Sequence, residues 1–180
     1  MKGFRAENKS KKTNKIKYIN NEIINKAFKS HSEGNIREAT KYYQQIISQG
    51  CVDPRVFSNY GVILKNLGKL KDAEISTRKA IELNPNYSQG FLNLGLILKD
   101  LNNLKDAEIS TRKGIKLNPN NANGYSNLGG ILQDLGKLKE AEVSLIKAIQ
   151  LNPNLTKAYF SLSSLKYCLL YTSDAADDQA

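Results

Sequence analysis

The chain has 180 residues, a formal net charge of +10 and a single histidine. Its two cysteines are too few for a disulfide framework or a cysteine-rich zinc site, and no stretch approaches the roughly 20 apolar residues of a membrane-spanning helix. The basic N-terminus is not followed by an apolar run of signal-peptide length, so the sequence predicts a soluble cytoplasmic protein.

Residues 1–17 hold much of the positive charge, with seven Lys and Arg residues against Glu7 and a net charge of +6. The segment is poor in large apolar side chains, so we expect a disordered basic tail. Its lysines offer contacts to the phosphates of a nucleic acid. Because no aromatic residues alternate with these lysines to stack on bases, a solvated arm is the preferred interpretation and nucleic-acid binding the weaker alternative.

The rest of the chain repeats with a period of 34 residues. The segment Leu70–Lys79 returns unchanged as Leu104–Lys113 and in a looser form as Leu138–Lys147, and Leu-Asn-Pro-Asn follows each copy. A fixed period of this length indicates stacked supersecondary units, and such arrays usually hold a partner rather than transform it.

Within each unit the apolar residues follow helical spacing on two segments. Gly68 lies between the two segments, and Asn102 and Gly136 take its place in the later units. Glycine and asparagine tolerate the positive φ that ends a helix, and an Asn-Pro pair closes the second segment. Each unit is therefore predicted to be an antiparallel pair of helices of about 14 residues.

Small residues recur where the two helices must approach one another. They are Gly61, Gly95 and Gly129 on the first helix, and Ala73, Ala107 and Ala141 on the second. Glycine destabilises a helix interior, so its recurrence predicts a close contact. Gly114 has alanine counterparts in the other units, Ala80 and Ala148, and we therefore expect Gly114→Ala to stabilise the array.

This pattern resembles the tetratricopeptide repeat (TPR) family, whose 34-residue helix–turn–helix carries small residues at its eighth and twentieth positions and proline near its end. In that frame the units span 54–87, 88–121 and 122–155, with Phe57, Phe91 and Tyr125 at their fourth positions. Thr77 and Thr111 replace the usual bulky residue of the second helix. The resemblance implies an all-α fold, a right-handed α-solenoid of antiparallel helix pairs (TPR superhelix).

The two ends of the array depart from this pattern. A degenerate N-terminal unit is predicted over 20–53, with Cys51 in place of the proline, and a truncated first helix over 156–167. Residues 168–178 resemble the translation of a sequencing-adapter sequence. We therefore expect 168–180 to be a non-native tail, and the natural protein to continue beyond Tyr167.

One face of each first helix is the candidate functional site. Its second, sixth, ninth and thirteenth positions lie within about 60° of one another on a helical wheel. The resemblance implies that this face lines a concave groove that binds peptide. The candidate residues are Arg55, Asn59, Asn66, Gln89, Asn93, Leu96, Asp100, Asn123, Asn127 and Asp134.

Three of these residues, Asn59, Asn93 and Asn127, recur at the sixth position and predict a ladder of amides. An amide both donates and accepts, so the ladder could pair with peptide main chain. The alternative is that asparagine simply suits a solvated helix face. The Lys/Asn clamp that some family members use for a C-terminal carboxylate is not matched. Lys65 and Lys99 flank the groove, either as contacts for acidic ligands or as solubilising residues.

The sequence offers little that would support catalysis. His31 has no placed carboxylate or thiol partner, and no phosphate-binding glycine loop, metal-ligand cluster or nucleophile elbow appears. We predict no catalytic residue, no metal and no cofactor. The main hypothesis is a scaffold that binds a protein or peptide. The alternative is the recruiting arm of a larger bacterial enzyme, sulfotransferase-like or a glycosyltransferase. No oligomeric state is predicted.

Overall fold

The computed structural model describes residues 21–177, with side chains through Lys166, and every regular element in that range is a helix. A first helix covers residues 21–32. It is followed by α2 (Ile36–Ser48), α3 (Pro54–Asn66), α4 (Leu70–Leu83), α5 (Ser88–Asp100), α6 (Leu104–Leu117), α7 (Ala122–Asp134), α8 (Leu138–Leu151) and α9 (Thr156–Asp177). The basic tail predicted over residues 1–17 lies outside the described residues. None of the described helices has the length and hydropathy needed to span a bilayer.

The turns between paired helices have the predicted backbone. Gly68 and Gly136 have φ of +75° and +72°, and Asn102 has a φ of +60° at the matching place. The second helices end at the leucine before Asn-Pro, at Leu83 for α4 and Leu151 for α8. The helix–turn–helix units predicted from the repeat are thus confirmed at the level of their elements.

Helix α2 ends differently from the later second helices. Gly50, with a φ of +77°, takes the left-handed conformation just after α2, and its N–H donates to the carbonyl of Ile47 at 3.0 Å. Pro54 then begins α3, and the Asp53 carboxylate accepts the Arg55 backbone N–H at 2.9 Å as an N-cap. Proline at the first helical position and aspartate at the cap both favour helix initiation.

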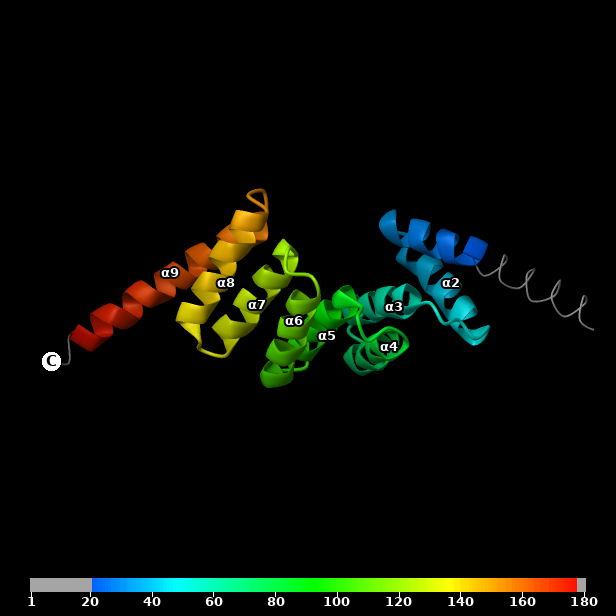
Figure 1. The fold of residues 1–180 in the computed structure, drawn as a ribbon, viewed down its shortest axis with the longest axis horizontal. Coiled ribbons are helices and arrows are strands. Elements are labelled where there is room, and N and C mark those ends of the chain that lie inside the picture. Colours follow the sequence, from blue (N-terminus) through cyan, green and yellow to red (C-terminus); the bar gives the residue numbers. More distant parts are fainter. Residues whose placement is uncertain (1–20, 178–180) are drawn as a thin grey trace, which may run out of the picture.

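The helices form a curved stack of pairs that follow one another along the long axis (Figure 1). The helices within the pairs α3–α4, α5–α6 and α7–α8 are in the most extensive contact. First helices also contact one another, α3 with α5, α5 with α7 and α7 with α9. Successive second helices have no comparable contact in the part of the chain that the structure describes. The first helices therefore line the inner, concave side and the second helices the outer side.

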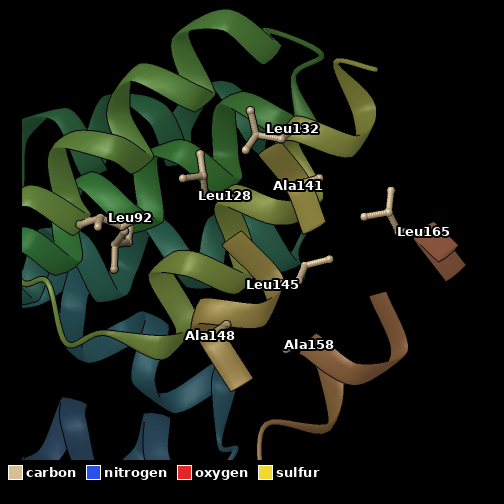
Figure 2. Close-up of a cluster of buried hydrophobic side chains, with 9 residues drawn as sticks. Leu92, Leu128, Leu132, Ala141, Leu145, Ala148, Ala158 and Leu165 are labelled. Carbon is tan, nitrogen blue, oxygen red and sulfur yellow. The ribbon is translucent and has the colours of Figure 1, made fainter. Parts of the chain in front are cut away.

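The hydrophobic core is divided into clusters, each of which joins side chains of neighbouring units. Figure 2 shows one cluster in which Leu92 of α5 and Leu128 and Leu132 of α7 lie with side chains of α8 and α9. Ala158 and Leu165 of α9 are fully buried in this cluster, so the last described helix is packed onto the array by one face. Each unit thus buries its apolar surface against its neighbours, as expected of a solenoid.

The glycines of the first helices lie where a side chain has no room. A Cβ at Gly129 would stand 2.6 Å from Leu145 Cγ, and one at Gly61 would overlap the hydroxyl of Thr77. The close contact predicted for these glycines is confirmed. The smaller Thr77 and Thr111 face Gly61 and Gly95, and their hydroxyls are buried without a hydrogen-bond partner in the described structure.

The contacts of Gly114 argue against the expectation that Gly114→Ala stabilises the array. A Cβ at Gly114 would lie 2.6 Å from Leu92 Cδ2, 2.9 Å from Leu92 Cγ and 3.1 Å from the Ser88 carbonyl oxygen. The neighbouring units hold serine at the place of Leu92 and alanine at the place of Gly114; these pairs are Ser58 with Ala80 and Ser126 with Ala148. The middle unit instead combines a large residue with glycine.

Helix α9 is longer than predicted, because it continues to Asp177 without a turn near Tyr167. Tyr159 is 48% and Phe160 78% exposed on this helix. Their counterparts two units earlier, Phe91 and Leu92, are buried. The predicted non-native tail over 168–180 lies partly in α9 and partly outside the described residues.

Candidate functional site

The ten candidate residues all lie on the first helices α3, α5 and α7, which form the inner side of the stack. The exposed members are Arg55, Asn66, Gln89, Asp100, Asn123 and Asp134, and the half-buried members are Asn59, Leu96 and Asn127. Asn93 is buried, with 7% of its surface exposed. The face is thus mostly polar and open to solvent, with one buried amide near its centre.

Asn93 joins two units rather than facing the solvent. Its amide nitrogen donates to the Ser58 hydroxyl of the preceding unit at 2.9 Å, and its carbonyl oxygen accepts from the Gln89 amide at 2.8 Å. The buried amide therefore has a donor and an acceptor partner within the protein. In the predicted ladder this amide would face a peptide; in the structure it forms a contact between two units instead.

The other two members of the ladder also contact neighbouring units. The Asn127 carbonyl oxygen accepts from Lys157 Nζ at 3.3 Å. Burial raises the pKa of Tyr43, in the preceding unit, to about 12, and the side chain of Asn59 opposes this rise. Both asparagines are half-buried, so they remain accessible from the groove.

Ion pairs between units run along the same side of the array. Lys65 Nζ lies 3.0 Å from Asp100 Oδ2, and Lys99 Nζ lies 3.0 Å from Asp134 Oδ2. Each lysine is paired with the aspartate 35 residues later, in the following unit. Sequence reasoning missed this pairing because it looked for partners within single helices, although the 35-residue spacing recurs in the sequence.

Lys157, near the start of α9, extends this row of charges. Partial desolvation of its ammonium group lowers its pKa, as do the positive charges of Lys99 and Lys65, while Asp100 opposes the shift. The curvature of the stack therefore brings the charges of α3, α5 and α9 within range of one another. No carboxylate of residues 21–166 forms an ion pair with Lys157.

The outer side carries a feature that sequence reasoning did not single out. Ile75, Ile109 and Val143 occupy the same position of successive second helices and are 69%, 66% and 68% exposed. Ile75 borders a cavity of about 710 Å³ beside α2 and α3, and Ile109 borders one of about 440 Å³ beside α4 and α5. The sequence did carry a signal for this feature, because an apolar residue recurs every 34 residues at a position outside the core-facing side of the second helix.

His31 lies at the end of the first helix, with Nδ1 3.3 Å from the Tyr43 hydroxyl, and burial lowers its pKa. Residues 21–166 contain no cluster of His, Cys, Asp and Glu suited to a metal ion. The histidine is thus a packing residue of the first unit, in contact with the ring of Tyr43.

Comparisons with known proteins agree on one family. Two family models described as tetratricopeptide repeat match residues 54–87 and residues 77–109 and 111–143. No curated protein sequence matches the chain.

Solved structures are similar over most of the chain at low identity. MamA (residues 41 to the end) from Desulfovibrio magneticus RS-1 has 22% identity and a TM-score of 0.72, covering 88% of this chain and 89% of that one. YrrB, described as a TPR protein with an unusual peptide-binding site, has 21% identity and a TM-score of 0.66, covering 75% and 70%. The first TPR domain of Spaghetti (RPAP3), bound to an HSP90 peptide, has 23% identity and a TM-score of 0.63, covering 66% and 94%.

At this level of identity the structural likeness speaks for the fold alone. The fold agrees with the matched repeats and with the helix pairs described above. The chain belongs to the tetratricopeptide repeat family.

Proposed function

We propose that the chain is a protein-interaction scaffold that binds an extended peptide segment of a partner on its concave face. The observation that carries the proposal is the polar inner face of three successive first helices, α3, α5 and α7, whose other sides are buried in the array. Such a face repeats its chemistry at a fixed spacing, as an extended peptide also does. YrrB and the Spaghetti domain, similar in fold, are described as peptide-binding proteins, which supports this assignment.

The candidate residues contribute in different ways to this proposal. Asn59 and Asn127 are half-buried, so their amides are available to pair with the main chain of a ligand. Asn93 has a structural part in this face, because its amide donates to Ser58 of α3 and so joins α5 to α3. Arg55, Gln89 and the other exposed members surround the bound segment.

Peptide selection by display, followed by affinity measurement with the full chain, tests the proposal. The double variant Asn59→Ala/Asn127→Ala should bind the selected peptides about tenfold more weakly, because each lost amide removes about 0.5–1.5 kcal/mol. The matched control Asn84→Ala/Asn118→Ala changes the Asn-Pro ends of α4 and α6, away from the concave face.

Two results would overturn the assignment. Unchanged affinity of the Asn59→Ala/Asn127→Ala variant would move the site off the concave face, and the exposed residues around Ile75 and Ile109 would become the next surface to alter. Failure to select any peptide that binds the folded chain would remove the scaffold function itself.

A further inference from the structure

A groove lies on the outer side of the array between α2 and α4. Both helices contact α3, but they have no comparable contact with one another in the described part of the chain. The space between them is a cavity of about 710 Å³. Phe57, Tyr60 and Leu64 of α3 form its floor, and Ile47 of α2 and Ile75 of α4 line its two walls. We call this space the outer groove.

The outer groove is more open than the equivalent place one unit later. The cavity that borders α4, α5 and α6 has about 440 Å³. Phe91 and Leu94 on its floor are 6% and 3% exposed, whereas Phe57 and Tyr60, at the same positions of α3, are half-buried. The apolar floor of the outer groove is therefore accessible to a ligand.

Two lysines account for this difference. Lys113 of α6 lies over the Phe91 ring, with Nζ 4.4 Å from the ring centroid, and so covers the floor of its own groove. The corresponding Lys79 of α4 instead forms an ion pair with Glu82 at 2.8 Å. In the next unit Lys116 takes the place of Glu82, and it repels Lys113 instead of attracting it. The sequence of α4 thus draws Lys79 toward the edge of the outer groove.

The polar groups of the outer groove favour a helical ligand over an extended one. The groove is built from three helices, whose backbone groups are bonded internally. Ser76 Oγ donates to the Phe57 carbonyl oxygen at 2.8 Å, and Gln44 Nε2 donates to the Tyr60 hydroxyl at 3.1 Å. An extended segment would leave main-chain groups unpaired on an apolar floor, which costs free energy. A helix satisfies its own backbone and presents only side chains to such a groove.

The length and charges of the groove describe that helix further. The lining residues of α4 and its N-cap run from Lys69 to Glu82, about 20 Å at 1.5 Å per residue, or three to four helical turns. All charged lining residues belong to this edge, because α2 contributes Gln44 and Ile47. Lys69 and Asp72 are exposed and form no ion pair within residues 21–166, whereas Arg78 and Lys79 are paired within α4.

We propose that the outer groove is a second docking site, which binds one amphipathic helix of a partner protein. Apolar side chains of that helix, spaced i, i+4 and i+7, contact Phe57, Tyr60 and Ile75. An acidic and a basic side chain one turn apart on the same helix face Lys69 and Asp72, and this pairing fixes its direction. The outer groove lies on the opposite side of the array from the proposed peptide site, so one chain holds two partners at once.

The probe is a displayed library of helix-forming peptides of about 15 residues, randomised on one face and along both of its edges and selected on the full chain. We expect apolar residues at i, i+4 and i+7, with one acidic and one basic residue along one edge. Proline in the middle of the best peptide should abolish binding, because it breaks the helix. Undiminished binding of the proline peptide would show an extended ligand and overturn the assignment.

Two matched variants test the position of the site. Ile75→Glu should weaken the best peptide at least about tenfold, because a charge replaces an apolar contact. Val143→Glu makes the same change at the same position of α8, where the residue is 68% exposed and outside the outer groove, and should leave the affinity unchanged. Equal affinities of the two variants for the peptide would overturn the site. Both residues are exposed, and thermal melting checks that both variants are folded.

Reversal of one charge tests the edge of the groove. Selection on Asp72→Lys should replace the basic residue of the peptide by an acidic one. Asp106→Lys, at the same position of α6, is the control and should leave the selected sequences unchanged. Peptides that keep their basic residue on Asp72→Lys would contradict the proposed pairing.

Sedimentation equilibrium of the chain alone identifies the occupant. We expect the same result for wild type and Ile75→Glu; self-association that Ile75→Glu abolishes would place a second copy in the groove and overturn the partner helix. Peptides selected for the concave face depend on Asn59 and Asn127, so Ile75→Glu should leave their affinity unchanged. Failure of the outer groove and failure of the concave site are therefore seen separately.

Discussion

The contact between Gly114 of α6 and Leu92 of α5 makes a sharp prediction about the packing of this array. Replacing glycine by alanine inside a helix normally stabilises it by about 0.5–1 kcal/mol. Here the new methyl group would enter the space of a leucine side chain that is 1% exposed, with Cδ2 at 2.6 Å. Overpacking of this kind costs about 1–3 kcal/mol, so Gly114→Ala should lower the free energy of unfolding by up to about 2 kcal/mol.

Removing the leucine should reverse the sign. In a Leu92→Ala background the two shortest contacts are removed and only the Ser88 carbonyl oxygen, at 3.1 Å, stays close, so Gly114→Ala should then stabilise the protein by up to about 0.5–1 kcal/mol. Leu92→Ala itself should cost about 2–5 kcal/mol because it leaves a cavity in the core. The double-mutant cycle should therefore give a coupling energy of about 1–3 kcal/mol between the two sites.

Urea unfolding of the four proteins, followed by far-ultraviolet circular dichroism, measures these energies. Ala80→Gly is the matched control, because it places glycine at the same position of α4, where the facing position holds Ser58. Ala80→Gly should lower the free energy of unfolding by about 1 kcal/mol, as glycine usually does in place of alanine inside a helix. If Gly114→Ala stabilises both backgrounds equally, the close packing of Leu92 against α6 does not limit this site and the reasoning fails.

Three further predictions concern other positions. Gly61→Ala should lower the melting temperature by several degrees because its Cβ meets α4, whereas Gly130→Ala should leave it unchanged or raise it; equal effects would contradict the contact distances. Asn102→Val should destabilise the turn, where φ is +60°, by about 1–2 kcal/mol in urea unfolding, and Asn102→Gly should not. Burial lowers the pKa of His31 in the folded protein, so its stabilising effect is complete above about pH 6.5 and is lost as the pH falls. The melting temperature of His31→Asn should accordingly fall less than that of the wild type between about pH 7.5 and pH 5.5, and an identical fall would exclude this role.

The fold was predictable because the turn residues, the Asn-Pro pairs and the small residues all recur with the same 34-residue period. Asn102 illustrates this, since it replaces glycine at the turn and takes the same left-handed conformation. The packing of individual pairs was less predictable. Ala80 and Gly114 directly follow identical ten-residue segments, and their difference has meaning only beside Ser58 and Leu92 on the facing helices.

The candidate site was predictable as a face but not as a set of contacts. A helical wheel places Asn93 on the groove side, yet its burial depends on Ser58 of the preceding unit, which a single-helix projection leaves out. The pairing of Lys65 with Asp100 also crosses from one unit to the next. Such contacts depend on how units stack, and stacking geometry is not encoded within one period.

The ion pairs Lys65–Asp100 and Lys99–Asp134 join neighbouring units on the inner side of the stack. They join α3 to α5 and α5 to α7 on the side of the stack where the helices are closest together, so they resist straightening of the solenoid. Salt weakens exposed ion pairs, which makes the curvature of this array a property that responds to ionic strength. Lys99 also donates to the Gly130 carbonyl oxygen of α7 at 3.4 Å, so two contacts of this lysine join α5 to α7.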